Sequence, residues 1–527
     1  MNRDEMVEKL ETQPEYWDTI VIGGGATGLG AAVEAASRGY KTLLLEQHDF
    51  AKGTSSRSTK LIHGGVRYLQ QGNISLVLEA LNERGLLIQN APHLVHHQSF
   101  IVPSYEWWNG PFYGVGLKVY DLLAGKLGLG PSKILSREET LARIPTLEPE
   151  GLRGGVIYYD GQFDDARLAV NLAQTVAELG GTPINYMEVT GLVKSESGML
   201  CGLRAKDAET GREFEINGRV VINATGIFTD GILRMDEPQA RKIITSSQGV
   251  HLVLDKEFLP GNSAILVPHT SDGRVLFAVP WHQRVVVGTT DTPMDEPALE
   301  PRALDEEIDF ILENIAKYLR KDPTRADVLS VFAGLRPLVS HEGVDSNTAG
   351  ISRDHYLAVS SSGLVTITGG KWTTYRKMAE DTINQAALIA GLNIRECVTK
   401  TLRIHGWLKN TDKSDPLHYY GSDILGIKKI IKNNPALGDK LHPELPYLKA
   451  QVIWAVRKEM ARTIEDVLAR RTRAILLNAR ASIEIAPETA RLMAREFGFD
   501  RKWQRAQVED YRKLADGYLL NGKGNKS

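Results

Sequence analysis

Three glycines and one acid near the beginning of the chain have the spacing of a motif that binds phosphates and a ribose. Gly23, Gly25 and Gly28 directly follow a short apolar run, and Glu46 ends a second such run. In this pattern the first glycine permits a tight turn, the second lets backbone approach a pyrophosphate, and the third lets a helix lie close to a strand. A carboxylate at the position of Glu46 can accept hydrogen bonds from both ribose hydroxyls. These residues predict a site for the ADP half of a dinucleotide.

Two strands and one helix must hold these residues in place. The runs at residues 19–22 and 42–45 have the length of buried strands, and the small residues between them favour a helix that ends at Gly39. The N-terminus of this helix would face the phosphates with unpaired N–H groups and a positive dipole end. Glycines cluster in ordinary turns as well, but here the strand, the helix and the acid all agree with the motif.

A long polar loop after Glu46 favours FAD over NAD as the dinucleotide. Residues 50–70 are rich in glycine, serine and threonine, as a loop along an extended flavin needs to be, whereas an NAD domain would continue to its next strand. Hydroxyl and N–H groups of Thr54, Ser55 and Ser56 are expected at the pyrophosphate and the ring. Such hydroxyl clusters are also common as plain turn chemistry, so that alternative stays open.

Two later apolar runs end in glycine and are expected to return to the same sheet. One reads RVVINATG, and the other reads LVTITGG and precedes a helical pattern. We expect Thr225 and Gly226 near the adenosine. Gly369, Gly370 and the start of the next helix would lie near the flavin O2 position, where a positive dipole end stabilises the reduced anion. The nucleotide domain is therefore predicted to be discontinuous.

The composition is that of a soluble globular protein of about three domains. The chain has 527 residues, 42% of them hydrophobic, and a net charge of −2, so its overall charge makes no case for nucleic acid binding. Cys201 and Cys397 are too few for a disulfide scaffold or a thiol metal cluster; two reduced cysteines in a cytosol-facing protein and no metal site are expected. No apolar run predicts a membrane span, and the polar first residues lack the features of a secretory signal or a transit peptide.

The segments inserted into the nucleotide domain are predicted to be rich in β-structure, and the last quarter of the chain to be helical. The runs RVLFAVPW and RVVVGTT flank His282 and Gln283, which suits a hairpin in an antiparallel sheet. From about residue 399 apolar residues recur at helical spacing. Asp466 and Arg470 can pair there on one helix face, and Pro487 is expected near the start of a helix.

Together these patterns predict an α/β fold with a Rossmann-like FAD-binding domain of the glutathione-reductase type, an antiparallel β substrate domain and a C-terminal helical domain. The expected boundaries are 1–17 for an N-terminal leader; 18–100, 150–245 and 356–395 for the discontinuous FAD-binding domain; 101–149 and 246–355 for the substrate-binding or cap domain; 399–520 for the helical domain; and 521–527 for a disordered tail.

Eight stretches, in order between residue 18 and about residue 380, are similar to one known family. They are IGGGATGLG, TSSRSTKLIHGGVRYL, YYDGQFDDARL, INATG, GTTDTP, GLRPL, SRDH and GGKWTTYRKMAE. In these stretches the chain resembles the FAD-dependent glycerol-3-phosphate dehydrogenases, and its helical end fits the last domain of that family. The resemblance implies oxidation of sn-glycerol 3-phosphate to dihydroxyacetone phosphate, with electrons passing to FAD and then to a membrane quinone.

The resemblance also implies a place in the cell and leaves an alternative activity. Mitochondrial relatives carry a targeting segment and calcium loops, and neither pattern is found here, so the bacterial type, attached peripherally to the cytoplasmic face of the cell membrane, is expected. The alternative is an oxygen-using glycerol-3-phosphate oxidase or another FAD-dependent oxidase of the same fold. The short spacing from Arg353 to Gly369 disfavours the extra segment of such oxidases. The oligomeric state, a homodimer included, stays open.

A phosphorylated alcohol needs several fixed cations, which arginine supplies best. Arg336, Arg353 and Lys371 lie at apparent strand ends or glycine-flanked turns, and Arg67 lies in the flavin loop. A single arginine is more often a surface charge, but these four occur in the stretches that resemble the family. The resemblance implies that they line the substrate end of the flavin, with Arg353 as the main phosphate ligand and Arg67 and Lys371 beside it.

Oxidation of an alcohol also needs a base for the hydroxyl proton, and histidine is the natural one near neutral pH. His251 begins an apolar run and matches a family histidine near the ring, although by itself it reads as a hydrogen-bonded residue at a strand end. Arg336 is expected to assist by stabilising the forming alkoxide or the reduced flavin. His63 is the rival base, but its glycine neighbours indicate packing against the flavin.

A quinone acceptor requires contact with a bilayer, and two segments could provide it. Within residues 105–130, a short apolar helix that carries Lys118 and Lys126 follows Trp107, Trp108, Phe112 and Tyr113. This suits either a segment at the level of the headgroups or a core helix. The second segment is the basic helix around Arg470, Arg471 and Arg473, for which a salt-bridged domain face is the favoured interpretation.

Overall fold

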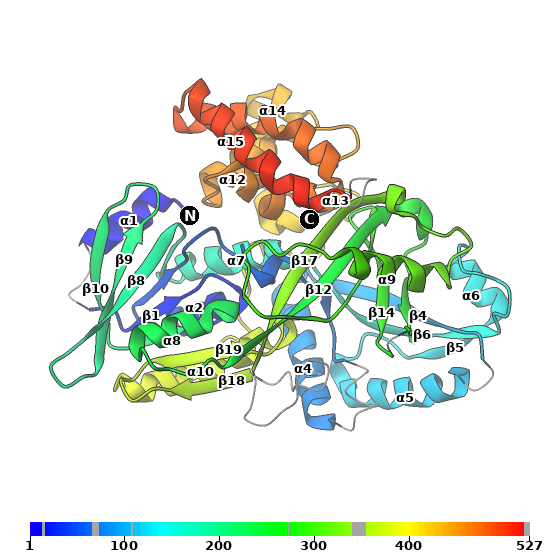
Figure 1. Cartoon of the computed structure of the whole chain (residues 1–527), viewed down its shortest axis with the longest axis horizontal. Helices are drawn as coiled ribbons and strands as arrows, with labels where there is room; N and C mark the ends of the chain where they lie inside the picture. Colours follow the sequence, from blue (N-terminus) through cyan, green and yellow to red (C-terminus); the bar gives the residue numbers. More distant parts are fainter. Residues whose placement is uncertain are drawn as a thin grey trace.

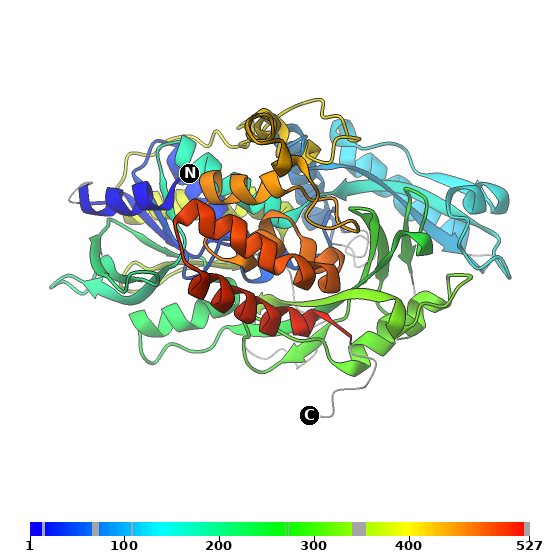
Figure 2. The ribbon, with the colours of Figure 1, turned by 90° about the horizontal axis from the view of Figure 1, so that it is seen from above.

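The computed structural model describes residues 1–12, 16–65, 73–106, 109–268, 270–271, 273–339 and 355–520, without the side chains of residues 109–115 and 126. Two large sheets lie side by side, and a group of helices from the end of the chain covers them on one side (Figure 1). The view from above shows these helices lying over the middle of the molecule (Figure 2). The expected disordered tail, 521–527, lies outside the described residues.

A six-stranded sheet carries the glycine motif. In spatial order its strands are β18 (His355–Val359), β19 (Val365–Gly369), β11 (Val221–Asn223), β1 (Thr19–Ile22), β2 (Thr42–Leu45) and β7 (Thr182–Ile184). β1 pairs in parallel with both β2 and β11, and β11 pairs in parallel with β19. Two segments more than 100 residues apart therefore return to the sheet of the motif, which confirms the predicted discontinuous domain.

The apolar runs become buried parallel strands because helices pack beside them. Every residue of β1 and β2 is buried. Helix α2 (Ala26–Ser37) packs against both strands and contacts α7 (Asp165–Glu178) and α10 (Tyr375–Ile389). Such a strand needs no polar face, which explains its continuous apolar sequence.

The second large sheet forms the substrate side of the molecule. Its order is β16–β12–β15–β14–β13–β4–β6–β3, with β17 paired to β12 and β5 to β6. The predicted hairpin is confirmed as β14 (Leu276–Trp281) and β15 (Arg284–Gly288), and both turn residues, His282 and Gln283, have positive φ, as a tight two-residue turn requires. The other strands are β3 (Leu61–Ile62), β4 (His96–Ser104), β5 (Lys133–Ser136), β6 (Gly154–Gln162), β12 (Ile244–Asp255), β13 (Ala264–Val267), β16 (Thr292–Met294) and β17 (Val328–Val339).

The sheets divide the chain differently from the expected boundaries. β4 and β6 pair antiparallel along nine residues each, so both belong to the substrate sheet, although most of their residues fall in segments expected in the FAD-binding domain. The sequence does not show this pairing because the two strands are separated by about 50 residues that contain two helices. The expected leader contains helix α1 (Arg3–Thr12), whose Arg3 is buried in an ion pair with Asp207.

The remaining elements of the first 390 residues surround the two sheets. β8 (Met187–Lys194), β9 (Leu200–Asp207) and β10 (Glu213–Asn217) form a separate three-stranded antiparallel sheet. The remaining long helices are α4 (Ile74–Asn90), α5 (Asn109–Ala124), α6 (Arg137–Arg143), α8 (Thr229–Asp236) and α9 (Asp305–Ala316).

The C-terminal region is helical, as predicted, but its helices are short and turn sharply. Its elements are α11 (Ile424–Asn433), α12 (Lys449–Lys458), a π-helical turn (Asp466–Arg471), α13 (Ala474–Leu477), α14 (Ala479–Phe497) and α15 (Arg501–Ala515). Met460 and Arg473 have positive φ and break the helical path. Pro487 lies inside α14, so the prediction that it begins a helix is wrong. The i,i+4 pair of Arg470 with Asp466 is confirmed.

The basic helix considered as a lipid contact is buried instead. Arg470 and Arg471 both bond the carboxylate of Asp49, at 2.5–2.8 Å, and Arg473 bonds Asp165 at 2.8 Å. All three arginines are nearly inaccessible to solvent. The lipid interpretation of this helix is therefore wrong, and the salt-bridged domain face is confirmed. These buried pairs join the helical domain to the nucleotide domain.

Replacing His405 by glutamine is expected to destabilise the protein more at pH 6 than at pH 10. His405 bonds Glu178 on α7 and Asp423 beside α11, at 2.6 and 2.9 Å. These two carboxylates raise its pKa to about 9 against opposing desolvation. A raised histidine pKa contributes stability that is fully present below the unfolded value near 6.5 and is lost as the pH rises through about 9. Denaturant unfolding at the two pH values measures the difference.

The matched control for this measurement is His442→Gln. His442 pairs with Glu484, whose side chain is largely exposed, and pairs of that kind contribute little to stability. Equal losses for His405→Gln at pH 6 and pH 10 would contradict the expectation.

Candidate active site

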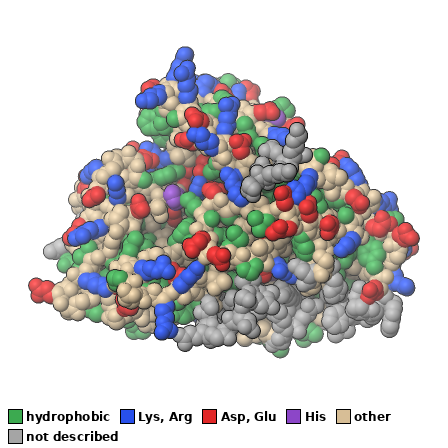
Figure 3. All heavy atoms as spheres, in the orientation of Figure 1, with side chains coloured by type: hydrophobic (Ala, Val, Ile, Leu, Met, Phe, Trp, Pro, Cys, Tyr) green, Lys and Arg blue, Asp and Glu red, His purple; other side chains and the backbone are tan. Residues whose placement is uncertain are grey.

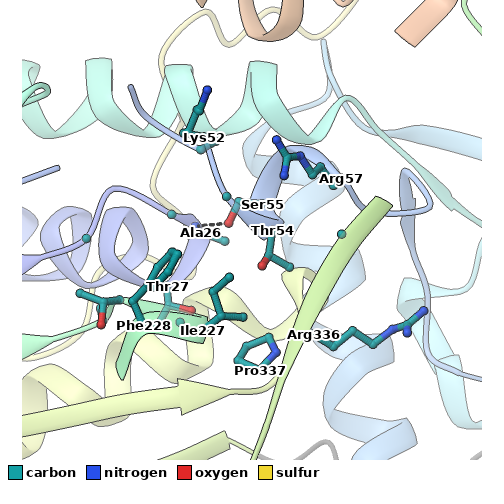
Figure 4. A pocket seen from close by; sticks show the side chains of 18 of the residues that line it. Ala26, Thr27, Lys52, Thr54, Ser55, Arg57, Ile227, Phe228, Arg336 and Pro337 are labelled. Atoms are coloured by element: carbon teal, nitrogen blue, oxygen red, sulfur yellow. Dashed lines mark hydrogen bonds between the residues drawn. The ribbon is translucent and has the colours of Figure 1, made fainter. Parts of the chain in front are cut away.

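A cavity of about 500 Å³ lies where the glycine motif, the flavin loop and the substrate sheet meet. Figure 4 shows Ala26 and Ser55 joined by a hydrogen bond on one side of it, and Arg336 on β17 extending away from them. Both sheets contribute to the lining, so neither domain alone would form the cavity. The predicted site residues that line it are Gly23, Gly25, Glu46, Thr54, Ser55, His63, Thr225, Gly226, His251, Arg336, Gly369, Gly370 and Lys371.

The glycines of the motif are required by close backbone contacts. Gly23 has a φ of +108°, and a Cβ there would lie 2.6 Å from the carbonyl oxygen of Ala224. A Cβ at Gly28 would lie 1.9 Å from the carbonyl oxygen of Gly23, so Gly28 sits behind the cavity and lets α2 approach β1. Ser55 Oγ accepts a hydrogen bond from Ala26 N in the first turn of α2 (2.9 Å).

Gly28→Ala is expected to weaken FAD binding roughly ten- to a hundredfold. The added methyl group must push the backbone of Gly23 out of the turn, and overpacking of this kind costs about 1–3 kcal/mol. The flavin content and dissociation constant of the purified variant check this. Gly191→Ala is the control, since nothing lies within 4 Å of a Cβ at that position. Unchanged flavin content in Gly28→Ala would contradict the prediction.

Glu46 is held where the motif predicts it. Its carboxylate accepts hydrogen bonds from Gly24 N at 2.6 Å and from His48 N at 2.8 Å. Burial raises the pKa of this carboxyl, and the two N–H donors oppose the rise. The two bonds fix the orientation of the carboxylate at the cavity wall, which suits binding of a ribose diol.

The hydroxyls of the flavin loop divide between the cavity and the protein interior. Thr54 Oγ1 donates to the carbonyl oxygen of Leu335 (2.6 Å) while Thr54 lines the cavity. Ser56 is buried and is not part of the lining. Its carbonyl oxygen accepts hydrogen bonds from Lys60 and Arg473, at 2.7 Å each, so Ser56 anchors the loop rather than facing the cavity.

The turn after β19 and the segment around His63 meet at another part of the wall. Gly369 and Gly370 both have positive φ, and a Cβ at Gly370 would lie 2.4 Å from Met378 Sδ. The N–H of His63 bonds the hydroxyl of Thr373 (3.3 Å), and the His63 ring lies 6.4 Å from that of Phe277. This pairing holds His63 against the turn, in agreement with a packing role.

His251 lies on β12 and is almost wholly buried beside the cavity. Its Nε2 lies 2.9 Å from the hydroxyl of Thr59, and its ring stacks on Phe332 with centroids 4.8 Å apart. Burial, with smaller contributions from the charges of Lys60 and Arg336, lowers its pKa well below the usual value. The imidazole is therefore neutral at physiological pH and can accept a proton.

Arg336 lies beside His251 within a polar network. Its guanidinium bonds the carboxylate of Asp291 at 3.2 Å, the hydroxyl of Thr289 at 3.2 Å and the carbonyl oxygens of Gln248 and Thr290. These partners fix the guanidinium in one orientation, as a group that stabilises developing charge should be.

The structure places one of the other three predicted cations. Lys371 lines the cavity at the start of a short 3-10 turn (Trp372–Thr374). Arg67 and Arg353 lie outside the described residues. Thr59 and Trp372 also line the cavity, and the indole N–H of Trp372 donates to the carbonyl oxygen of Ser55 (2.9 Å). Neither residue was predicted as a site residue, although both lie in stretches that resemble the family.

Comparison with known proteins gives the chain a family. Residues 18–376 match the family of FAD-dependent oxidoreductases, and residues 364–504 match the C-terminal domain of alpha-glycerophosphate oxidase. A probable mitochondrial glycerol-3-phosphate dehydrogenase from Caenorhabditis elegans is 43% identical over 98% of this chain and 75% of that protein. The chain belongs to the FAD-dependent glycerol-3-phosphate dehydrogenase family. The human mitochondrial glycerol-3-phosphate dehydrogenase is 42% identical over 97% of this chain and 75% of that protein.

Solved structures agree with this assignment to the glycerol-3-phosphate dehydrogenases. The glycerol-3-phosphate dehydrogenase of Bacillus halodurans, solved with FAD, is 30% identical and superposes with a TM-score of 0.78 over 99% of each chain. The L-alpha-glycerophosphate oxidase of Mycoplasma pneumoniae, at 17% identity and a TM-score of 0.55 over 74% of this chain and 99% of that chain, shares the fold. The relatives include mitochondrial and bacterial proteins, so the expectation of a bacterial type stays a prediction.

The residues on the cavity wall fit the FAD of this family. The glycine turn leaves no room for a side chain between β1 and α2, Glu46 offers a fixed carboxylate, and the first turn of α2 lies at the same wall. Beyond them the wall continues to His251 on the substrate sheet. The residues of the dinucleotide motif and the imidazole of His251 therefore share one cavity.

Proposed function

We propose that this protein oxidises sn-glycerol 3-phosphate at C2 in this cavity and that the electrons pass on to a membrane quinone. The observation that carries the proposal is the position of His251, a buried neutral imidazole at the cavity that the dinucleotide motif lines, with Arg336 and Lys371 in the same lining. When bound, FAD supplies the acceptor for the hydride from C2. The protein itself must bind the phosphate, orient C2 and take the hydroxyl proton.

His251 takes that proton in the proposed mechanism. A neutral imidazole accepts a proton as the hydride leaves, and Arg336 stabilises the negative charge that develops on the oxygen. Burial contributes most to the lowered pKa of His251, and the charges of Lys60 and Arg336 add to it. The charge of a bound phosphate dianion would offset the contribution of the two cations. Substrate binding would thus raise the proton affinity of His251 at the step that needs it.

Lys371→Met is expected to raise KM for glycerol 3-phosphate roughly ten- to a hundredfold, with a smaller change in kcat. We propose that Lys371, with Arg67 and Arg353, binds the phosphate; a charged hydrogen bond of this kind contributes about 1.5–3 kcal/mol. Steady-state kinetics on the FAD-loaded variant measure both constants. Lys377→Met is the control, because Lys377 pairs with Asp381 on the surface of α10. A normal KM for Lys371→Met would remove Lys371 from the phosphate site.

Reduction of an artificial dye by the purified holoenzyme tests the proposed reaction. Under anaerobic conditions glycerol 3-phosphate should bleach the flavin and reduce the dye, and glycerol should do neither at the same concentration. Stoichiometric peroxide release in air, without stimulation by a quinone analogue, would favour the oxidase instead. A flavin that no phosphorylated alcohol reduces would overturn the proposal.

We also propose peripheral attachment to the cytoplasmic face of a membrane, through α4 and α5. No helix in the described part of the chain is long and apolar enough to cross a bilayer. The two helices pack together at the lower edge of Figure 1, with Leu122 80% and Ile74 50% exposed. The aromatic residues of the predicted headgroup segment, at 107–108 and 112–113, lie outside the described side chains.

Flotation of the holoenzyme with anionic vesicles tests this attachment. Leu122→Asp should reduce the bound fraction, whereas Leu425→Asp, on the exposed side of α11 in the helical domain, should not. On the part of the molecule that is coloured in Figure 3, basic and acidic side chains are interspersed, so charge alone does not mark that part as a lipid surface. Equal binding of both variants and the unmodified protein would contradict the assignment.

A further inference from the structure

A buried carboxylate behind the cavity accepts hydrogen bonds from several groups of the flavin loop. Asp165 is the first residue of α7 and is inaccessible to solvent. It accepts hydrogen bonds from the N–H and the hydroxyl of Ser58, at 3.1 and 2.7 Å, and from Lys60 Nζ, at 2.6 Å. Its other oxygen accepts a bond from Arg473 at 2.8 Å. One carboxylate therefore fixes the residues on both sides of Thr59.

Thr59 connects this anchored segment to the proposed base. Its hydroxyl lies 2.9 Å from His251 Nε2. Lys60, the next residue, has a φ of +64°, a conformation that a side chain disfavours and that the surroundings must hold in place. Lys60 Nζ is held by Asp165 and by the carbonyl oxygen of Ser56. The position of the Thr59 hydroxyl is thus set by bonds on either side of it.

The hydrogen bond with Thr59 determines the orientation of the His251 imidazole, because the other contacts of the ring do not. The ring of Phe332 stacks on one face of His251, and a Cβ at Gly288 would lie 2.4 Å from its Cδ2. Among the described residues Nδ1 has no hydrogen-bond partner. Stacking alone restricts the plane of the ring but allows a half-turn flip about the Cβ–Cγ bond, so the bond at Nε2 determines where the two nitrogens point.

Arg473 connects the C-terminal helical domain to Asp165 and to the flavin loop. It lies between the π-helical turn and α13 of the C-terminal helical domain, and it bonds both Asp165 and the carbonyl oxygen of Ser56. Lys60 and Arg473 both pair with Asp165, and Arg473 also lies 3.7 Å from Asp164. Without Arg473, Asp165 would keep Lys60 as its paired cation. The carbonyl oxygen of Ser56, in the loop before Thr59, would lose one of its two hydrogen bonds.

We propose that Thr59 is a positioning residue for proton transfer to His251, and that Asp165 and Arg473 hold it in place, so that the C-terminal helical domain contributes to catalysis. This rests on the proposed role of His251 as the base. In the proposed arrangement the hydroxyl of Thr59 accepts a hydrogen bond from Nε2–H, which sets the tautomer and orientation of the imidazole and leaves Nδ1 to take the proton. The hydrogen bonds around Asp165 set the position of that hydroxyl. The helical domain then acts on the reaction through Arg473 without contacting the substrate.

Steady-state kinetics on FAD-loaded variants test this proposal. Thr59→Val should lower kcat about ten- to a hundredfold and leave KM for glycerol 3-phosphate nearly unchanged, since displacement of a base by about 1 Å costs up to that much. Thr59→Ser keeps the hydroxyl and should restore most of the rate. Arg473→Met should lower kcat in the same way, with Arg473→Lys in between, because a lysine keeps the charge but not both bonds.

Arg167→Met is the matched control for Arg473→Met. Arg167, on α7, forms a buried ion pair with Glu459 of the helical domain and bonds the carbonyl oxygen of Arg471, but no bond joins it to residues 58–60. It should lose stability while the folded, FAD-loaded fraction keeps its kcat. A loss of kcat as large in Arg167→Met as in Arg473→Met, or a normal kcat in Arg473→Met, would overturn the role of the helical domain.

His251→Ala separates failure of this inference from failure of the proposed function. If His251→Ala is inactive and Thr59→Val has a normal kcat, the positioning role of Thr59 is overturned while the base assignment stands. If His251→Ala turns over normally, both are overturned. A low rate in Thr59→Val that Thr59→Ser does not restore would also count against the hydroxyl.

Discussion

Replacing His251 by alanine is expected to lower kcat for glycerol 3-phosphate by about 10²–10⁴-fold, the usual contribution of a general base. His251 is buried at the cavity, and burial lowers its pKa well below the ordinary value, so its imidazole is neutral at physiological pH and has a lone pair for the hydroxyl proton. FAD should stay bound, because the glycines and Glu46 that line the nucleotide end are unchanged. Anaerobic dye reduction per mole of bound flavin measures the effect.

His63→Ala is the matched control for this prediction. His63 also lines the cavity, but its backbone pairs with Thr373 and its ring lies against Phe277, which indicates packing. We expect the fold reduction in kcat of His63→Ala to be less than a tenth of that of His251→Ala. The main consequence of His63→Ala should be a weaker affinity for the flavin. A normal turnover rate for His251→Ala, or a larger loss for His63→Ala, would transfer the role of base away from His251.

Replacing Asp49 by alanine is expected to lower the free energy of unfolding by about 3–5 kcal/mol, as removal of one partner from a buried ion pair does. Asp49 bonds Arg470 and Arg471, and all three side chains are buried between the nucleotide and helical domains. The variant would leave two guanidinium groups without their shared carboxylate in a region that excludes water. Chemical denaturation at neutral pH measures the loss.

The pH dependence of stability provides a second test of Asp49. The two arginines hold the pKa of this carboxyl at about 2, below its ordinary value of 3.8, although burial opposes them. A depressed carboxyl pKa contributes stability that is present above the unfolded value and is lost as the pH falls through about 2. The difference between the unmodified protein and Asp49→Ala should therefore shrink in strong acid.

Asp439→Ala is the control for Asp49→Ala. Asp439 pairs with Lys449 at 3.2 Å within the helical domain, but its side chain is 65% exposed, and exposed pairs contribute at most about 1 kcal/mol. If both variants lose the same stability, the buried pairs do not hold the helical domain in place. A small loss for Asp49→Ala would also weaken the proposed action of Arg473, which depends on the same interface.

The nucleotide half of the site could be predicted from local sequence because its constraints are local. Gly23, Gly25, Gly28 and Glu46 lie within 24 residues, and the turn, helix and strand that use them are consecutive. The return of β11 and β19 to this sheet was also predictable, since both are buried parallel strands that read as apolar runs ending in glycine.

The substrate half could be predicted only as a set of residue types. His251 was predicted as a histidine that matches one of the family, and Arg336 as a cation in a matching stretch. Their neighbours come from other segments: Thr59 from the flavin loop, Phe332 from β17 and Asp291 from the turn after β15. The pairing of β4 with β6 across an expected boundary could not be predicted for a related reason. No local sequence pattern shows which distant strands pair antiparallel.

The sequence by itself determined the dinucleotide motif, the family resemblance and the helical character of the last domain, because each depends on residues close together along the chain. Only the tertiary structure decided that Arg470, Arg471 and Arg473 face the protein interior rather than lipid, and that Asp165 links one of them to Thr59 and His251. The physical reason is that burial and pairing of a charge depend on what packs against it. An arginine that the sequence suggests is a surface charge forms a buried ion pair when the fold places a carboxylate from a distant segment beside it.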